Sequence, residues 1–245
     1  MNKVSKNAIA VLVNFAFCTN QLFANLPPET FDTIEWIPYQ PVGQGSQPGW
    51  QLSLGNAVVS GAGEGFNGGQ ALHLPVNPVA RTKITRAVTW DVNEKTAFID
   101  FRLKPASDPT GSYSSFSVNG TQLAFQVPAG ATKGEIWVLN GADTLGTPNA
   151  NPTQWIKTAG SFDVAGTAAT SYSRITLRHD YLRNIWDLFV DGKLVAVNLA
   201  FEARGANLTS IDFYGSQIGD TLIDDLPLKP AICFFQTRKF PGGDR

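Results

Sequence analysis

Apolar and polar residues alternate in short runs along most of this chain, and Gly, Asn, Asp and Pro separate the runs. No run keeps an apolar period of 3.6 residues for three turns, so amphipathic helices are not expected. A period of two places apolar side chains on one face of a strand and polar side chains on the other. The pattern predicts an all-β fold, with strands over Asn56–Ser60, Gln70–Leu74, Thr82–Trp90, Thr96–Lys104, Ser114–Val118, Gln122–Val127, Glu135–Leu139, Gln154–Thr158, Ser161–Val164, Ser173–His179, Asn184–Val190, Lys193–Asn198, Leu208–Tyr214 and Thr221–Leu228.

These strands outnumber the roughly ten that one open sheet holds before it curls or splits, so two packed antiparallel sheets are expected. Residues 25–228 show no break in composition and no repeat of about 20–50 residues, which favours a single domain. Charged residues make up 16% of the 245 residues, and the formal net charge is −1. So weak a charge argues against nucleic acid as a partner, because phosphate binding needs a concentrated basic surface.

The sharpest local signal is an Asp-Gly pair between the apolar runs Ile185–Val190 and Lys193–Val197. Asp191 and Gly192 supply the two positive-φ positions of a type I′ turn, and a two-residue loop fixes the register of its strands. The predicted pairs are Val190 with Lys193, Leu188 with Val195 and Trp186 with Val197. One side of this hairpin is almost wholly apolar, so we expect it to face the core.

Residues 1–24 have the order of a secretory signal peptide, with Lys3 and Lys6 before an apolar run from Ala8 to Phe17. The run is about half of the roughly 20 residues that a membrane span needs. We therefore expect cleavage, a secreted extracellular or periplasmic protein, and no membrane insertion after the signal is removed. Cys233 is then the only thiol, so no internal disulfide is expected. Residues 229–245 form a C-terminal tail to a domain of residues 25–228.

Several short motifs are spread over roughly residues 29–228. They are Glu29-Thr-Phe31, Gly49-Trp50, Gly69-Gln-Ala-Leu-His-Leu74, Glu135-Ile-Trp137-Val-Leu-Asn140, Arg174-Ile-Thr-Leu-Arg178, Trp186-Asp-Leu-Phe-Val-Asp-Gly-Lys-Leu-Val-Ala196 and Leu222-Ile-Asp-Asp-Leu226. In these motifs the chain resembles the bacterial secreted LamG-like jelly rolls of the concanavalin A-like lectin/glucanase superfamily. The resemblance implies a two-sheet antiparallel β-sandwich with a concave face, which binds glycans, adheres to a partner or cleaves polysaccharides.

Catalytic motifs are missing from the sequence. A laminarinase-type glycosidase carries Glu-x-Asp-x-x-Glu on one strand, whereas the nearest match, Glu135-Ile-Trp137-Val-Leu-Asn140, has Trp and Asn at the last two acidic positions. His73 and His179 are expected to be hydrogen-bonded strand residues. The leading hypothesis is a secreted non-catalytic module that binds carbohydrate or another extracellular surface. A divergent polysaccharide hydrolase or lyase, and a structural or adhesive domain without a small ligand, remain alternatives.

Two sets of residues are candidates for glycan binding. Trp137 is out of phase with the apolar Ile136 and Val138, and Trp155 follows a polar loop, so both indoles are candidates to stack on a sugar. Four outward polar residues of central strands are candidates to bind hydroxyl groups, namely Asp100, Arg102, Arg178 and Asp187. We expect Asp100, Arg102 and Arg178 to share the concave sheet with Trp137.

A structural calcium ion is a further prediction. The first and last strands pair in many sandwich modules, and Glu29 lies near the start of the domain while Asp224 and Asp225 lie near its end. Calcium takes six to eight oxygen ligands, which carboxylates and backbone carbonyls supply. The alternative is that one of the two Asp residues is solvated at an edge and the other caps a turn.

Overall fold

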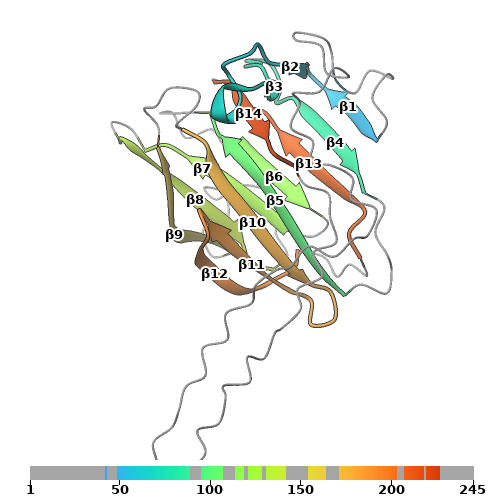
Figure 1. The fold of residues 1–245 in the computed structure, drawn as a ribbon. Helices are drawn as coiled ribbons and strands as arrows, with labels where there is room; N and C mark the ends of the chain where they lie inside the picture. The colour runs from blue at the N-terminus through green and yellow to red at the C-terminus, as the bar shows by residue number, and fades with distance from the viewer. Residues whose placement is uncertain are drawn as a thin grey trace, which may run out of the picture. The chain divides into compact units, whose positions relative to one another are not determined.

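The computed structural model describes residues 42, 49–88, 95–106, 114–118, 121–128, 131–141, 154–163, 171–202, 207–217 and 219–226. All of them belong to one compact unit, Leu26–Pro230. This unit is an all-β sandwich of two antiparallel sheets, as the sequence predicts (Figure 1). Its described helical structure is a short 3₁₀ turn, η1 (Phe66–Gly68). The part of the chain that the structure describes has no helix long and apolar enough to cross a membrane.

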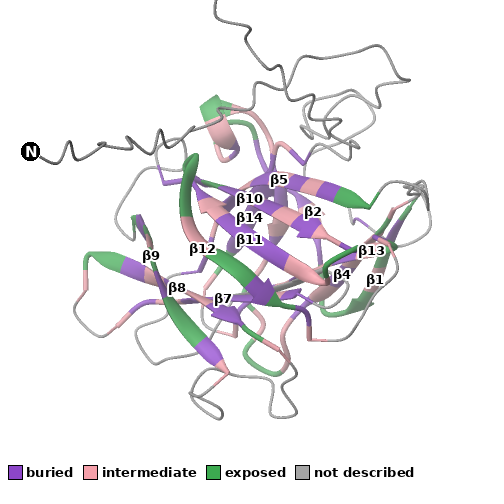
Figure 2. Ribbon diagram, turned by 90° about the horizontal axis from the view of Figure 1, so that it is seen from below, coloured by how far each residue is buried: buried purple, intermediate pink, exposed green. Residues whose placement is uncertain are grey.

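Each sheet has seven strands. Sheet I runs, in spatial order, through β1 (Trp50–Leu54), β4 (Lys83–Ala87), β13 (Ser210–Tyr214), β6 (Ser114–Val118), β7 (Thr121–Gln126), β8 (Lys133–Leu139) and β9 (Trp155–Asp163). Sheet II runs through β12 (Lys193–Ala200), β11 (Ile185–Val190), β10 (Ser173–Asp180), β5 (Thr96–Lys104), β14 (Thr221–Asp224), β3 (Leu72–Leu74) and β2 (Val58–Val59). In Figure 2 the edge strands β9 and β12 are largely exposed, whereas β10 and β11 are largely buried.

The core lies between the sheets and is built from the apolar side of each alternating strand. Phe101 of sheet II meets Phe213 of sheet I edge to face, with ring centroids 5.6 Å apart. Phe162 lies directly over Gly134, its partner on the neighbouring strand. A Cβ on Gly134 would sit 1.9 Å from the Phe162 ring, so only glycine fits there. Other large, fully buried side chains include Trp186, Phe125, Leu72, Leu74, Ile84, Ile99, Leu123 and Ile136.

The predicted Asp-Gly turn is confirmed, because φ is +48° at Asp191 and +75° at Gly192. The predicted register is correct only for Val190 and Lys193. Further along, Leu188 pairs with Ala196 after one register shift, and Trp186 pairs with Leu199 after a second. As a result Leu199 is buried in the core and Val197 is 52% exposed.

A carboxylate and a left-handed residue explain the second of these shifts, between the Leu188 and Trp186 pairs. Asn198 has φ of +54°, and its N–H donates to Asp187 Oδ1 at 2.8 Å. Such a conformation adds a residue to one strand as a bulge and moves all later pairs. The periodicity of the sequence does not reveal the bulge, because Asn198 follows a run in which nothing marks an extra residue.

Two strand predictions differ from the structure. The segment Trp50–Leu54 is a strand that was not predicted, although Trp50 and Leu52 alternate with polar residues. Gln154–Thr158 and Ser161–Val164 were predicted as separate strands, but β9 runs through both. Its irregularity at Gly160 is held by Thr158 Oγ1, which accepts the Gly160 N–H at 3.0 Å and donates to the Ile136 carbonyl at 3.0 Å.

A buried histidine links the sheets. His179 of β10 is 0% exposed, its Nε2 lies 3.2 Å from Thr121 Oγ1 of β7, and its Nδ1 lies 3.0 Å from the Tyr181 hydroxyl. Burial lowers the pKa of His179 to about 3. The imidazole is therefore neutral near pH 7 and is a hydrogen-bonded core residue, as the sequence analysis expects.

Candidate functional site

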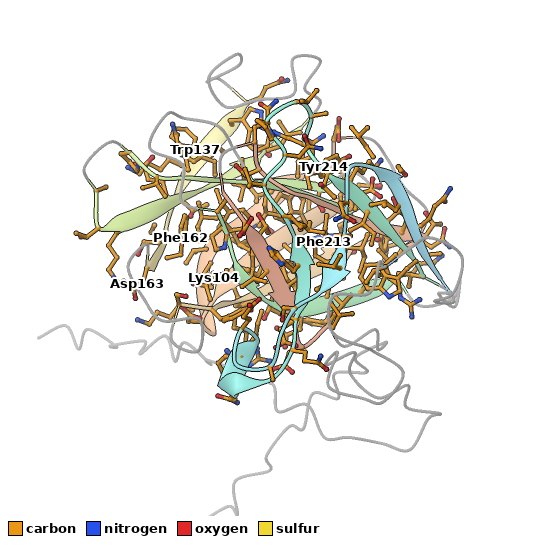
Figure 3. The ribbon with its side chains drawn as sticks, turned by 90° about the horizontal axis from the view of Figure 1, so that it is seen from above. Lys104, Trp137, Phe162, Asp163, Phe213 and Tyr214 are labelled. Atoms are coloured by element: carbon orange, nitrogen blue, oxygen red, sulfur yellow. The ribbon has the colours of Figure 1, made fainter. Side chains whose placement is uncertain are left out.

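The outer face of sheet I is the face that its strands turn away from the core. On β8, Ile136 and Val138 are fully buried, whereas Trp137 between them is half-buried and points outward. The predicted phase of this indole is therefore confirmed. Figure 3 shows Trp137 and Tyr214 on the same side of sheet I, opposite the core residues Phe162 and Phe213.

Hydrogen bonds fix the orientation of the Trp137 indole. Its Nε1–H donates to Glu135 Oε2 at 3.1 Å, and Lys157 Nζ donates to Glu135 Oε1 at 2.5 Å. Lys157 lies opposite Trp137 on β9, and its side chain is 54% exposed. An exposed ion pair contributes at most about 1 kcal/mol to stability. Its effect here is to hold an aromatic ring, a carboxylate and an ammonium group in one fixed arrangement.

Apolar residues support Trp137 on this face. Ala124, Leu139 and Trp155 form a small cluster, separate from the main core, against which Trp137 packs. Trp155 is only 2% exposed, so it presents no open ring face in this structure. Of the two tryptophans singled out in the sequence, Trp137 is half-buried and Trp155 is buried against it, and their role in ligand binding stays a prediction.

A second aromatic group stands on the same face and was not singled out in the sequence. Tyr214 of β13 is half-buried, and Lys83 Nζ lies 5.4 Å from the centroid of its ring. Asp212 accepts hydrogen bonds from Lys83 Nζ at 3.0 Å and from Thr85 Oγ1 at 2.7 Å. The hydrogen bond to Asp212 raises the pKa of Lys83, which keeps this ammonium charged. Asp212 and Tyr214 alternate with the buried Phe213 along β13. This alternation in the sequence predicts that both side chains point outward.

The four polar candidates lie on the other sheet, which corrects the expectation that three of them share a sheet with Trp137. Asp100 and Arg102 belong to β5, Arg178 to β10 and Asp187 to β11, all in sheet II. Alternation along a strand determines which side chains point outward, but it does not determine the sheet to which the strand belongs. Their role in ligand binding stays a prediction.

Each of these four residues has a partner within the protein. Asp100 accepts hydrogen bonds from Arg174 Nε and from Thr176 Oγ1, the latter at 2.8 Å. Arg178 forms an ion pair with Asp187, whose side chain is buried. Arg102 Nε lies 3.2 Å from Asp225 Oδ2. The outer face of sheet II is thus crossed by Arg–Asp pairs that join its strands.

The two aspartates predicted to bind calcium make contacts beside the loop of η1. Asp224 is 2% exposed, accepts the Phe66 N–H on Oδ2 at 2.8 Å and accepts the Asp225 N–H on Oδ1 at 2.7 Å. Arg102, the partner of Asp225, lies over the Phe66 ring at 3.6 Å. Within the described ranges no three His, Cys, Asp or Glu side chains are grouped as a metal would require. Glu29 lies outside those ranges, and calcium binding stays a prediction.

No family model matches the chain, and neither does any curated protein. Solved structures do match. A carbohydrate esterase from the Shiga toxin-encoding bacteriophage phi24B has 16% identity and a TM-score of 0.50. The match covers 73% of this chain and 88% of the esterase chain. A sialidase has 13% identity and a TM-score of 0.49, covering 80% of this chain, which spans only 19% of the sialidase. The binding domain of botulinum neurotoxin DC in complex with SialylT has 12% identity and a TM-score of 0.41. The match covers 81% of this chain and 49% of the neurotoxin chain.

These likenesses concern the fold. Identities of 16% and below leave open the activity and the ligand of this chain. The sheet order describes a two-sheet antiparallel β-sandwich, and the similarity to the esterase is a similarity of this fold.

Proposed function

We propose that this protein is a secreted, non-catalytic β-sandwich module that binds carbohydrate on the outer face of sheet I. The observation that carries the proposal is the environment of Trp137. This ring is half-buried, is packed on the cluster of Ala124, Leu139 and Trp155, and is oriented by Glu135. A rigid aromatic ring supplies contact area at a low cost in conformational entropy, which is what an anchor residue needs.

The polar groups around the ring suit a sugar. The apolar face of a pyranose stacks on an indole, while its hydroxyl groups need nearby donors and acceptors. Glu135 supplies acceptors and Lys157 supplies donors beside the ring, and Gln126 stands opposite Glu135 on the neighbouring strand. Secretion is part of the same proposal and rests on residues 1–24 of the sequence, which lie outside the described ranges.

Glycan-array screening of the purified protein tests this function, followed by titration calorimetry of each bound glycan. Trp137→Ala should weaken binding by tenfold or more, equivalent to about 1.4 kcal/mol, whereas Trp137→Phe should retain part of the affinity. Phe98→Ala is the matched control, because Phe98 is a half-buried aromatic on the outer face of sheet II. Equal loss in the two alanine variants, or full affinity in Trp137→Ala, would contradict the proposed site.

The alternative of a polysaccharide hydrolase or lyase is tested with the same glycans. The bound glycans are incubated with the protein and analysed for new reducing ends and for unsaturated products. We expect no new reducing ends from hydrolysis, because two of the three acidic positions of the glycosidase motif are occupied by Trp137 and Asn140. Unsaturated products would identify a lyase and contradict the non-catalytic proposal.

A further inference from the structure

A row of neighbouring positions runs across six of the seven strands of sheet I, from β4 to β9. The strand pairs are in continuous register at this level, so each residue lies beside the next on the neighbouring strand. The row consists of Lys83, Tyr214, Ser115, Ala124, Trp137 and Lys157. Over these six positions the residue types are symmetric, with a lysine at each end, an aromatic residue next to it and two small residues in the middle. Beyond Lys83, Leu54 of the edge strand β1 continues the row.

Each half of the row has the same three chemical groups. In one half, Tyr214 lies beside Lys83, and Lys83 pairs with Asp212 at 3.0 Å. In the other half, Trp137 lies beside Lys157, and Lys157 pairs with Glu135 at 2.5 Å. In both halves the carboxylate stands two residues before the aromatic residue on its own strand. We call these two groups the Tyr214 module and the Trp137 module.

Strand direction relates the two modules by an approximate two-fold axis. Each of the three strand pairs from β13 through β6 and β7 to β8 is antiparallel, so β13 and β8 run in opposite directions. Asp212 and Glu135 therefore lie on opposite sides of the row. A half-turn about the sheet normal, between Ser115 and Ala124, exchanges one module with the other.

We infer that the two modules bind one linear, uncharged oligosaccharide chain that lies across the strands and contacts Tyr214 and Trp137 at separate sugar units. This inference rests on the proposed function and names its ligand class. Three strand spacings of about 4.8 Å place the two aromatic residues about 14 Å apart. One sugar ring is much shorter than this span, so only a chain of several units reaches both modules. A straight row favours an extended chain over a compact or branched glycan.

The charges on the row favour a neutral chain. Each lysine is paired with a carboxylate in its own module, so neither module has a net charge to offer an acidic sugar. A paired ammonium and carboxylate still offer donors and acceptors to neighbouring hydroxyl groups. Two linked contacts also raise affinity more than either alone, because the second contact forms within the same complex.

Calorimetry with length series tests this inference. The probes are cello-, xylo-, manno- and laminari-oligosaccharides, from disaccharide to octasaccharide, titrated into the full chain. At least one series should show a step of tenfold or more in affinity once the chain is long enough to span both modules. Tyr214→Ala should remove the step, and Trp137→Ala should remove the step and also weaken the short members.

Two control variants distinguish the loss of the Tyr214 ring from a general effect of substitution on the fold. Tyr214→Phe keeps the ring and should keep the step, and Phe98→Ala on sheet II should behave as the wild type. If binding requires Trp137 but the wild type shows no step, or if Tyr214→Ala retains the step, the two-module inference is wrong and the proposed function stands. If no series binds, the two-module inference is wrong, and a glycan found on the array through Trp137 still supports the proposed function. If the array is also empty, both fail.

Discussion

Asp187 of β11 is a buried carboxylate that contacts the bulge of β12 on one side and Arg178 of β10 on the other. Its side chain is only 3% exposed, one oxygen accepts the Asn198 N–H at 2.8 Å, and the other pairs with Arg178. Burying a carboxylate is costly unless it is paired and hydrogen-bonded, and here both conditions hold. Asp187 therefore acts as a structural residue that stabilises the bulge of β12, in addition to any role in binding that its sequence position predicts.

Replacing this carboxylate tests its structural role. Asp187→Ala leaves the Asn198 N–H and the Arg178 guanidinium without their partner, so we expect a loss of about 2 kcal/mol or more in the free energy of unfolding. Urea denaturation at pH 7 measures it. The matched control is Asp163→Ala, because the Asp163 side chain is 54% exposed and pairs with exposed Lys133, for which about 1 kcal/mol or less is expected. Equal losses in the two variants would contradict the structural role.

His179 gives the protein a predictable response to acid. Burial lowers its pKa to about 3 in the folded state, while an unfolded histidine titrates near about 6.5. The unfolded chain thus binds more protons between these values. The contribution of the neutral imidazole to stability is complete above about pH 6.5 and is lost as the pH falls toward 3, at up to about 1.4 kcal/mol per pH unit.

The variant His179→Gln should therefore unfold with a flatter pH dependence than the wild type. Unfolding free energies from urea titrations between about pH 7 and pH 4 supply the two slopes. The variant itself is expected to be less stable at pH 7, because Thr121 and Tyr181 lose their partner. Parallel pH profiles for the two proteins would show that His179 does not control the acid response.

At the scale of strands, the alternation of apolar and polar residues predicts well the face on which a side chain lies. It predicts poorly the sheet to which the strand belongs. It correctly placed Trp137 outward and Trp186 inward, because a period of two leaves no other arrangement for a strand with one buried face. It placed Asp100 and Arg178 on the sheet of Trp137, and this was wrong, because sheet membership depends on pairing between distant segments. It also missed the bulge at Asn198, which depends on the contact with Asp187.

The pairing of β8 with β9 depends on the absence of a side chain at Gly134. A Cβ there would lie 1.9 Å from the Phe162 ring, which is fixed in the core and packs 6.0 Å from Phe125. Gly134→Ala should therefore destabilise the protein by about 1–3 kcal/mol through overpacking. The double variant Gly134→Ala, Phe162→Leu should recover part of what the two single changes lose together. Thermal or urea unfolding measures both, and simple additivity would count against this contact.

The loop around η1 offers a second test at this scale, which also examines the calcium prediction. Asp224→Ala removes the acceptor of the Phe66 N–H, and we expect a loss of about 1–3 kcal/mol with or without a chelator. Melting curves of both proteins in EDTA and in calcium measure this. If chelator lowers the melting temperature of the wild type alone, Asp224 binds calcium, and Glu29 is the next residue to replace.

At the scale of the whole molecule, the two outer faces differ in how their charges are used. On sheet II, Arg174 with Asp100 and Arg178 with Asp187 join neighbouring strands directly. On sheet I, the pairs Lys83–Asp212 and Lys157–Glu135 also join neighbouring strands, but they stand beside aromatic rings, and Glu135 orients one of them. The first arrangement stabilises a sheet, whereas the second presents apolar rings among polar groups. This difference is why we assign ligand binding to sheet I.

The assignment predicts how binding responds to salt. The whole chain has a net charge of −1, and the lysines of sheet I are paired, so long-range attraction to an ionic polymer is weak. Contacts between a sugar face and an indole are apolar, and salt screens only charges. Affinity for a bound glycan should therefore change less than about twofold between roughly 0.05 and 0.5 M salt, while Trp137→Ala removes it at either concentration. An affinity that falls steeply with salt and is unaffected by Trp137→Ala would instead identify an acidic polysaccharide held by Arg and Lys, and would move the site away from sheet I.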